Sequence, residues 1–225
     1  ATDGDALVFL PGAPEIHRLR AQLEGQGTRD VVVHALHGEM RIESQQEVLE
    51  PDPRGRRKVI LSTNIAETSL TIEGVQVVID SGLARRSLFD PGTGMERLVT
   101  VRISQASAAQ RAGRAGRTAP GSAWRLWGEG AQATLAPQTP PEILTSDLAP
   151  LALELARWGA RDVGAMPWMD PPPAASLAQA RELLRRLEAI DATGAITSTG
   201  SEMLLTGLHP RLAHMLVRAR GTPLA

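Results

Sequence analysis

The sequence predicts an α/β protein, in which a parallel sheet with helices on both faces and an inserted β-hairpin precedes a mostly helical region. Short apolar runs alternate with helical patterns over about the first 128 residues, and after Gly128 the chain becomes rich in Ala, Pro and Leu. The length of 225 residues fits one or two domains. A hydrophobic fraction of 42% and a charged fraction of 22% are ordinary for a globular protein and exclude collagen-like and wholly disordered chains.

Four continuous apolar runs predict the strands of the sheet. They cover residues 6–10, 31–33, 59–61 and 75–79. Runs that are apolar on both sides are typical of parallel strands, because helices cover both faces of such a sheet. Between the first two runs, Ile16, Leu19 and Leu23 recur at helical spacing. Ligands bind at the carboxyl ends of strands in these sheets, so we expect the functional site in the loops after residues 61, 80 and 103.

A β-hairpin is predicted between Gly82 and Val101. Two strand-like segments, 83–89 and 95–101, flank the turn-forming sequence Asp-Pro-Gly-Thr-Gly. Three arginines lie on its arms: Arg85, Arg86 and Arg97. We therefore expect a hairpin with a basic surface.

The remainder of the chain predicts helices separated by prolines. Ser146 or Asp147 can cap a helix that ends near Trp158, and a second helix follows the proline run 171–173. Residues 191–197 predict a turn that enters a short strand, and a last helix begins at Pro210. Three helices with a small β-wing favour a winged-helix domain.

Composition excludes several other classes of protein. The sequence has no cysteine, which excludes disulfides, thiolate zinc sites and cysteine nucleophiles. No run approaches the ~18 apolar residues of a membrane span, and no basic and apolar leader opens the chain. We expect a cytoplasmic protein with no membrane partner. Because the sequence begins at Ala1 without Met, we also expect it to be a piece of a longer protein.

The charge is distributed unevenly along the chain. The formal net charge is −1 and taken alone argues against a nucleic-acid partner. Residues 81–128, however, carry eight arginines against two acidic residues, a net charge of +6, whereas the remainder has 16 basic and 23 acidic residues, a net charge of −7. A local basic field in an acidic protein favours a site for a polyanion.

One arginine motif carries most of the chemical information. In the sequence from Gln110 to Arg117, a helix over 107–114 would place Gln110 and Arg114 on one face, with Arg117 converging from the helix end. Two guanidinium groups and one amide at one point suit a site where negative charge develops on phosphoryl oxygens. The amide can orient a water there, so the motif indicates phosphoryl transfer.

Four segments together resemble the motifs of DEAH-box superfamily 2 helicases. Residues 110–117 resemble motif VI, residues 61–72 motif V, residues 7–12 motif IV, and residues 35–38 the short motif that follows motif IV. Their order and spacing also agree with the family. Segments 141–148 and 155–159 are most similar to a bacterial branch of it. The resemblance implies that residues 1–130 are a second RecA-like domain, residues 131–206 a linker and winged-helix domain, and residues 207–225 the start of a helical bundle.

The resemblance also implies roles for single residues. Gln110 would position the attacking water, and Arg114 and Arg117 would be arginine fingers. The implied cofactor-binding residues are Ser69, which senses the γ-phosphate, Thr71, Gly113 and Glu73, an acidic position near the ribose that is usually Asp. The implied nucleic-acid-binding residues are Thr63, Asn64, Arg85, Arg86 and Arg97. The hairpin corresponds to one associated with strand separation.

The segments that would complete the site are not in this sequence. The phosphate-binding P-loop and the Asp-Glu-Ala-His box, which bind ATP and Mg²⁺, belong in the family to a first RecA-like domain that precedes this one. The resemblance implies an ATP-dependent helicase acting on single-stranded nucleic acid, with RNA as the strand that the family favours. The first RecA-like domain of the same chain is then a partner, and the present residues alone should bind nucleotide weakly and hydrolyse none.

Other interpretations stay open at this point. The chain could be a non-catalytic module that binds nucleic acid or a protein partner. His34 and His37 have metal-like spacing but lie at a strand end without a nearby carboxylate cluster, so we expect no metal site. The loop 54–58, which ends in the only lysine, Lys58, could touch phosphates or be a solvated loop. The four tryptophans, at 124, 127, 158 and 168, are expected to pack in the core or against another domain rather than stack on bases.

Overall fold

A computed structural model describes residues 4–27, 30–68, 70, 72–90, 92–117, 119–160 and 162–220. The chain divides into two compact units. The first contains residues 1–86 and 98–139, and the second contains residues 87–97 and 140–225. Each unit is described on its own below.

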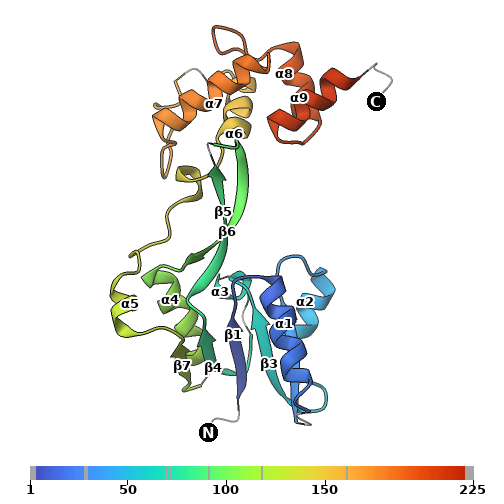
Figure 1. Cartoon of the computed structure of the whole chain (residues 1–225), viewed down its shortest axis with the longest axis vertical. Coiled ribbons are helices and arrows are strands. Elements are labelled where there is room, and N and C mark those ends of the chain that lie inside the picture. Colours follow the sequence, from blue (N-terminus) through green and yellow to red (C-terminus); the bar gives the residue numbers. More distant parts are fainter. Residues whose placement is uncertain are drawn as a thin grey trace. The chain divides into compact units, whose positions relative to one another are not determined.

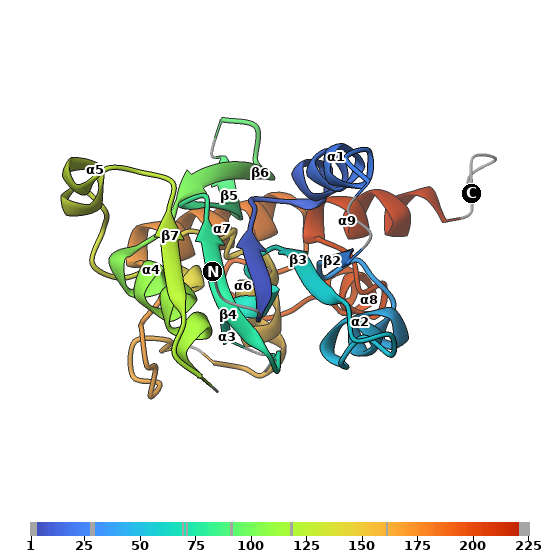
Figure 2. The same cartoon turned by 90° about the horizontal axis from the view of Figure 1, so that it is seen from below.

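The first unit is built on a parallel sheet (Figures 1 and 2). Its strands are β1 (Asp5–Phe9), β2 (Val31–Leu36), β3 (Arg57–Ser62), β4 (Val75–Asp80) and β7 (Ser122–Arg125). They lie in the order β2-β3-β1-β4-β7, and every neighbouring pair is parallel. The four strands predicted from apolar runs are thus confirmed, whereas β7 was not predicted.

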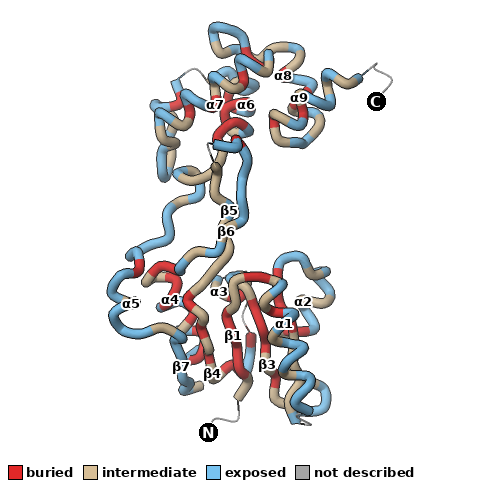
Figure 3. The backbone as a smooth tube through the Cα atoms, viewed as in Figure 1, coloured by how far each residue is buried: buried red, intermediate tan, exposed pale blue. Residues whose placement is uncertain are grey.

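Helices cover both faces of this sheet, as predicted. They are α1 (Ala13–Glu24), α2 (Ile42–Leu49), α3 (Ile65–Thr68), α4 (Gln105–Ala112) and the 3-10 helix η1 (Gly113–Gly116). A further short helix, α5 (Glu129–Ala133), has no buried residue. On one face, Val8 of β1 packs with Ile16 of α1. On the other, Leu7 and Phe9 pack in one cluster with residues of α2, α3 and η1. The alternation of side chains along β1 therefore feeds two separate cores; Figure 3 shows β1 and β4 as largely buried elements.

A close backbone approach joins η1 to the sheet. Gly121 precedes β7, and a Cβ atom there would lie 2.0 Å from the carbonyl oxygen of Ala115 and 2.4 Å from that of Gln76. Only glycine fits this position. Gly121 therefore lets η1 lie directly against β4 and β7.

The predicted hairpin is confirmed. It consists of β5 (Leu83–Asp90) and β6 (Met95–Arg102), which form a separate two-stranded antiparallel sheet. Asp90 closes the turn, because its Oδ1 accepts the Gly92 N–H at 2.9 Å and its carbonyl oxygen accepts the Gly94 N–H at 2.8 Å. The base of the hairpin groups with the first unit and its tip, residues 87–97, with the second.

The second unit is mostly helical. It contains the 3-10 helix η2 (Glu142–Leu144), α6 (Ala149–Arg157), α7 (Ala174–Arg186), α8 (Ser198–Leu205), α9 (Pro210–Ala219) and an antiparallel bridge between Ile190 and Ile196. Asp147 Oδ1 accepts the Ala149 N–H at 2.8 Å, at the start of α6. Leu153, Leu184 and Met203, one from each of three helices, are fully buried in its core. Helices α6, α7 and α9 and the short bridge appear where the sequence predicts them, whereas α8 was not predicted, and the winged-helix assignment stays a prediction.

The compact units do not end where the predicted domains do. Residues 131–139 group with the first unit, because the backbone N–H groups of Gln105 and Ala106 donate to the carbonyl oxygens of Ala136 and Pro137 at 2.8 and 3.1 Å. The predicted boundaries at 130 and 206 stay predictions. Within the described part of the chain, no helix has the length and apolar character needed to cross a membrane. The cytoplasmic location also stays a prediction.

Candidate functional site

The helix that carries the arginine motif begins and ends two residues earlier than predicted. The sequence predicts a helix over 107–114, whereas α4 ends at Ala112 and the Gly-Arg-Ala-Gly sequence continues as η1. Ser104 caps the start of α4, since its Oγ accepts the Ser107 N–H at 3.1 Å. Glycine is a poor α-helix former, and a 3-10 turn commonly tightens a helix end. Arg114 is therefore presented from a 3-10 turn.

The motif residues nevertheless gather around one recess. A hollow of about 360 Å³ is lined by Glu67, Thr68, Gln110, Gly113, Arg114 and Arg117. The first two come from α3 and the others from α4, η1 and the residue that follows η1. The structure thus brings together the amide and the two guanidinium groups that the sequence predicts to converge. Their roles stay predictions.

Arg114 is held by backbone carbonyl groups next to the recess. Its Nε donates to the Glu67 carbonyl oxygen at 3.0 Å, its Nη1 donates to the Leu70 carbonyl oxygen at 2.6 Å, and its Nη2 also donates to Glu67 O. Burial lowers the pKa of the Arg114 guanidinium, and the charge of Arg117 lowers it further. An anion in the recess would oppose both effects, because it favours the charged form of Arg114. The recess is therefore suited electrostatically to phosphate oxygens.

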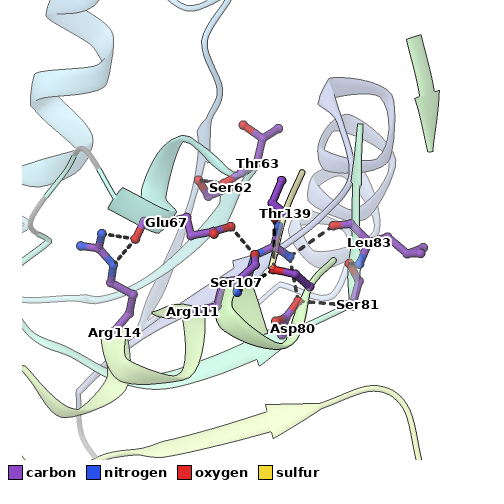
Figure 4. A network of polar contacts seen from close by, with 12 residues as sticks. Ser62, Thr63, Glu67, Asp80, Ser81, Leu83, Ser107, Arg111, Arg114 and Thr139 are labelled. Atoms are coloured by element: carbon purple, nitrogen blue, oxygen red, sulfur yellow. Dashed lines mark hydrogen bonds and ion pairs between the residues drawn. The ribbon is translucent and has the colours of Figure 1, made fainter. Parts of the chain in front are cut away.

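A buried ionic network lies behind this recess, and the sequence analysis missed it. Arg111 donates from Nε to Glu67 Oε2 at 3.0 Å, from Nη1 to Asp80 Oδ1 at 2.9 Å and from Nη1 to the Leu83 carbonyl oxygen at 3.2 Å. Its guanidinium carbon also lies 4.7 Å from the centre of the Phe9 ring. Figure 4 shows Glu67 between Arg111 and Arg114. The one clue in the sequence was Asp80, an acidic residue that ends an apolar strand run.

A second recess lies at the carboxyl ends of three neighbouring strands. It encloses about 460 Å³ and is lined by segments that follow β1, β2 and β3, among them the predicted residues Thr63 and Asn64. Arg85 of the hairpin base lines it too and pairs with Glu15, with 3.3 Å between Nη2 and Oε1. The loop after residue 61 is thus one wall of a recess, as the sheet topology predicts.

Two histidines line this second recess. The rings of His17 and His37 meet edge to face with centroids 5.8 Å apart, and His37 Nδ1 is buried without a hydrogen-bond partner. His34 of β2 does not line it. Burial, followed by the charge of Lys58, lowers the pKa of His34. Among the described residues, no group of three or more His, Asp or Glu side chains could hold a metal ion.

The other predicted residues lie elsewhere. Glu73 lines a recess at the amino ends of the strands with Arg56 and Arg57, apart from Arg114. Arg97 belongs to the hairpin tip in the second unit, where it pairs with Asp90 at 3.5 Å. Arg86 lies on β5 at the hairpin base. Ser69 and Thr71 lie outside the described residues.

The loop 54–58 has a structural explanation. Lys58 is buried, and its Nζ donates to the carbonyl oxygens of Val48 at 3.2 Å and Glu50 at 2.7 Å, where it caps the end of α2. Asp5 lies 3.6 Å from the same nitrogen. Arg56 pairs with Asp52 at 2.9 Å and holds the pKa of that carboxyl well below its usual range. The only lysine is therefore occupied within the fold and cannot serve as a phosphate-binding lysine.

The prediction of core packing is confirmed for Trp168, which packs against the core of the second unit, whereas Trp127 is only partly buried. The indole N–H of Trp127 donates to Gln132 Oε1 at 2.9 Å, and that of Trp168 donates to the Val163 carbonyl oxygen at 2.8 Å. Trp124 and Trp158 are not core residues, since they are 65% and 73% exposed, and packing against another domain stays a prediction for them. Trp124 lies on β7, whose four residues are all exposed, and Trp158 follows the last residue of α6.

Comparison with known proteins adds independent evidence. The family described as helicase conserved C-terminal domain matches residues 1–119. The ATP-dependent RNA helicase HrpB of Escherichia coli (strain K12) is 46% identical over 217 residues, which are 96% of this chain and 27% of that protein. The pre-mRNA-splicing factor ATP-dependent RNA helicase prp22 of Schizosaccharomyces pombe is 40% identical over 221 residues, 95% of this chain and 19% of that protein.

Solved structures agree with the sequence matches. A crystal structure of the Escherichia coli DEAH/RHA helicase HrpB has a TM-score of 0.90 and 45% identity, and the match covers 98% of this chain and 28% of that one. A crystal structure of the E. coli DExH-box NTPase HrpB has a TM-score of 0.85 and 45% identity over 97% of this chain and 27% of that one. The chain thus spans about a quarter of the length of HrpB. The DEAH-type resemblance predicted from the four motifs is confirmed, and the chain belongs to the helicase conserved C-terminal domain family.

Proposed function

We propose that this chain is the C-terminal part of an ATP-dependent RNA helicase and supplies half of its NTP site. The recess that gathers Gln110, Arg114 and Arg117 carries the proposal. In this role the two arginines offset the negative charge that develops on the phosphoryl oxygens, and the Gln110 amide orients the attacking water. The names of the relatives, which are ATP-dependent RNA helicases, support the same nucleotide and the same strand.

The other half of the NTP site comes, in this proposal, from a preceding RecA-like domain of the same protein. The recess fits phosphates, because two of its lining residues are arginines. Its one carboxylate, Glu67, already accepts a hydrogen bond from Arg111, so this half offers little to a Mg²⁺ ion. We assign the Mg²⁺ ligands and the P-loop to the preceding domain. ATP with Mg²⁺ would then be cleaved only when the two domains close on it.

Single-stranded nucleic acid, with RNA preferred, is the proposed second ligand. Thr63 and Asn64 line the recess at the carboxyl ends of β1, β2 and β3 and are suited to hydrogen-bond a phosphate backbone. Arg85 lines the same recess, and Arg86 and Arg97 extend the positive charge along the hairpin. Such contacts position a strand without reading its sequence.

A non-catalytic binding module is the second candidate. One observation favours it, because the Arg114 guanidinium already donates to carbonyl oxygens of the chain itself. In that case Arg114 would only hold the segment after α3 in place. The two candidates make different predictions for NTP hydrolysis by the full-length protein.

Phosphate release by the full-length protein tests the proposal. It should be measured without nucleic acid, with single-stranded RNA and with single-stranded DNA, for the wild type, for Gln110→Ala and for the matched control Gln22→Ala on the exposed surface of α1. We expect RNA to stimulate hydrolysis by the wild type and by Gln22→Ala, and Gln110→Ala to lose about 10²-fold or more. RNA binding by a wild type that hydrolyses no NTP would favour the binding module.

A further inference from the structure

Arg111 is the odd member of the arginine motif. Arg114 and Arg117 line the phosphate-facing recess, whereas Arg111 does not line it and is fully buried. A charged side chain in the interior is costly unless it is paired, and replacing buried ion pairs by apolar residues is often neutral or stabilising. Arg111 therefore calls for an explanation other than stability.

One end of the Arg111 network touches the recess through Glu67. The Glu67 side chain accepts from Arg111, and the Glu67 carbonyl oxygen accepts from Arg114. Glu67 also lines the recess itself. A shift of Arg114 toward a phosphate would remove hydrogen bonds from the Glu67 backbone and so act on the residue that holds Arg111 (Figure 4).

The other end of the network holds both ends of the hairpin. Arg111 donates to the carbonyl oxygen of Leu83, the first residue of β5, and to Asp80. Asp80 Oδ1 also accepts the Gly82 N–H at 2.9 Å, and the Gly82 carbonyl oxygen accepts from the N–H of Ile103, the residue after β6, at 3.0 Å. The start of β5 is thus bonded to Arg111 directly, and the end of β6 is linked to it through Gly82 and Asp80.

Gly82 restricts how the hairpin base can move. It has a φ of +73°, and a Cβ atom there would lie 2.7 Å from the Trp127 ring. The base is therefore tightly packed, and a displacement of Leu83 would move the start of β5 as a whole. Asp80 Oδ2, by contrast, is buried without a hydrogen-bond partner, so the network is not fully satisfied in this arrangement.

We propose that Arg111 is a positioning residue that couples the recess of Arg114 to the base of the β5–β6 hairpin through Glu67, Asp80 and the Leu83 carbonyl group. When phosphate occupies the recess, the hydrogen bonds that Arg114 donates to the Glu67 carbonyl group change. The Glu67 side chain then shifts Arg111, and Arg111 shifts the hairpin base. Nucleotide and nucleic acid then alter each other's affinity. The inference rests on the proposed function, because it needs a nucleotide in the recess and a strand on the hairpin.

The test uses full-length protein and measures coupling rather than activity alone. The dissociation constant for single-stranded RNA is measured with and without a non-hydrolysable ATP analogue, and that for the analogue with and without RNA. Each pair of dissociation constants, with and without the other ligand, gives one ratio, and thermodynamic linkage requires the two ratios to be equal. We expect a ratio that differs from one by about fivefold or more in the wild type, the usual scale of such coupling.

Arg111→Lys is the informative variant. Lysine keeps the charge but cannot reach two carboxylates and a carbonyl group with a planar fork. We expect the ratio to fall to near one, with RNA affinity in the absence of nucleotide changed less than about twofold. Arg102→Lys is the matched control, since Arg102 is at the hairpin base but donates to Thr134 outside the network, and its ratio should equal that of the wild type.

Each outcome decides a separate question. A wild type that RNA does not stimulate to hydrolyse NTP contradicts the proposed function. If RNA stimulates hydrolysis by the wild type but the wild-type ratio of dissociation constants is one, the inference is overturned and the proposed function is not. The same holds if Arg111→Lys keeps the wild-type ratio. If Arg111→Lys lacks the wild-type circular dichroism spectrum, Asp80→Asn replaces it, because the amide keeps an acceptor for Gly82 and removes the charge that faces Arg111. A folded Asp80→Asn protein with the full wild-type ratio would overturn the inference as well.

Discussion

Two arginine-rich regions of this chain use the same side chain in opposite ways. In the segment 105–117, Arg111 has an exposed side-chain fraction of 1% and makes three hydrogen bonds to other elements. In the hairpin, the Arg97 side chain is 67% exposed and pairs with one carboxylate at 3.5 Å. The guanidinium group of Arg111 is thus held in place before any ligand arrives, whereas that of Arg97 lies largely in solvent.

The difference shows what the net charge of +6 over residues 81–128 contains. A buried guanidinium is positioned and little affected by salt, as an NTP site requires. An exposed one attracts a polyanion at long range and is screened by salt. The local charge is therefore the sum of two components, which different experiments can separate.

The largest expected difference between the two regions is in stability. Arg111→Ala leaves the buried Asp80 carboxylate and the partly buried Glu67 carboxylate without their partner, and we expect a loss of about 3–5 kcal/mol in the free energy of unfolding. Arg97→Ala removes a surface pair and should cost about 1 kcal/mol or less. Urea denaturation of the two variants measures both. Equal losses of unfolding free energy in the two variants would show that the burial of Arg111 does not make its ion pairs more important for stability than the surface pair of Arg97.

A smaller effect is expected in the salt dependence of RNA binding. Arg85→Ala combined with Arg86→Ala removes two cations from the hairpin base. The slope of log K against log salt should therefore become shallower by about 0.7 for each phosphate of a single strand that these arginines neutralise in the wild type. Fluorescence titrations of full-length protein at several salt concentrations give the slope. An unchanged slope would show that Arg85 and Arg86 of the hairpin do not contact the phosphates of the nucleic acid.

The smallest effect concerns pH and the hairpin turn. The Gly92 N–H, followed by the Thr93 hydroxyl and Arg97, holds the pKa of Asp90 below its usual value. A carboxyl with a depressed pKa contributes stability that is present above the unfolded pKa, near 4, and is lost as pH falls through the folded value. The hydrogen-exchange protection factors of the tip amides, which are corrected for the intrinsic pH dependence of exchange, should therefore fall below about pH 4, and Asp90→Asn should remove that change. The same pH dependence in Asp90→Asn would assign it to another group.

The sheet and the hairpin could be predicted from sequence because their strands are apolar runs or flank a turn sequence. The edge strand β7 could not, since its residues Ser122–Arg125 are all exposed and it is held through backbone pairing with β4. Helix α2 was missed for a similar reason. Only Val48 of its residues is buried, and Ile42 is among the exposed large side chains, so no apolar stripe marks it.

The candidate site was predictable only where it is local. Gln110, Arg114 and Arg117 are neighbours in sequence, and spacing alone brings them to one recess. The partners of Arg111 are 44 and 31 residues away in the chain, at Glu67 and Asp80. No periodicity connects residues so far apart, so the network becomes visible only when the sheet places α3 and β4 beside α4.

The most direct test of the account is a pair of measurements on Arg114→Ala in the full-length protein, with Arg20→Ala on α1 as the control. An arginine finger contributes on the order of 10³-fold or more to the rate of phosphoryl transfer. The account predicts a loss of this size in NTP hydrolysis, an RNA dissociation constant within a few-fold of wild type, and no change in either for Arg20→Ala. Equal losses of hydrolysis and RNA affinity in Arg114→Ala would contradict it, because the arginine would then be a nucleic-acid contact.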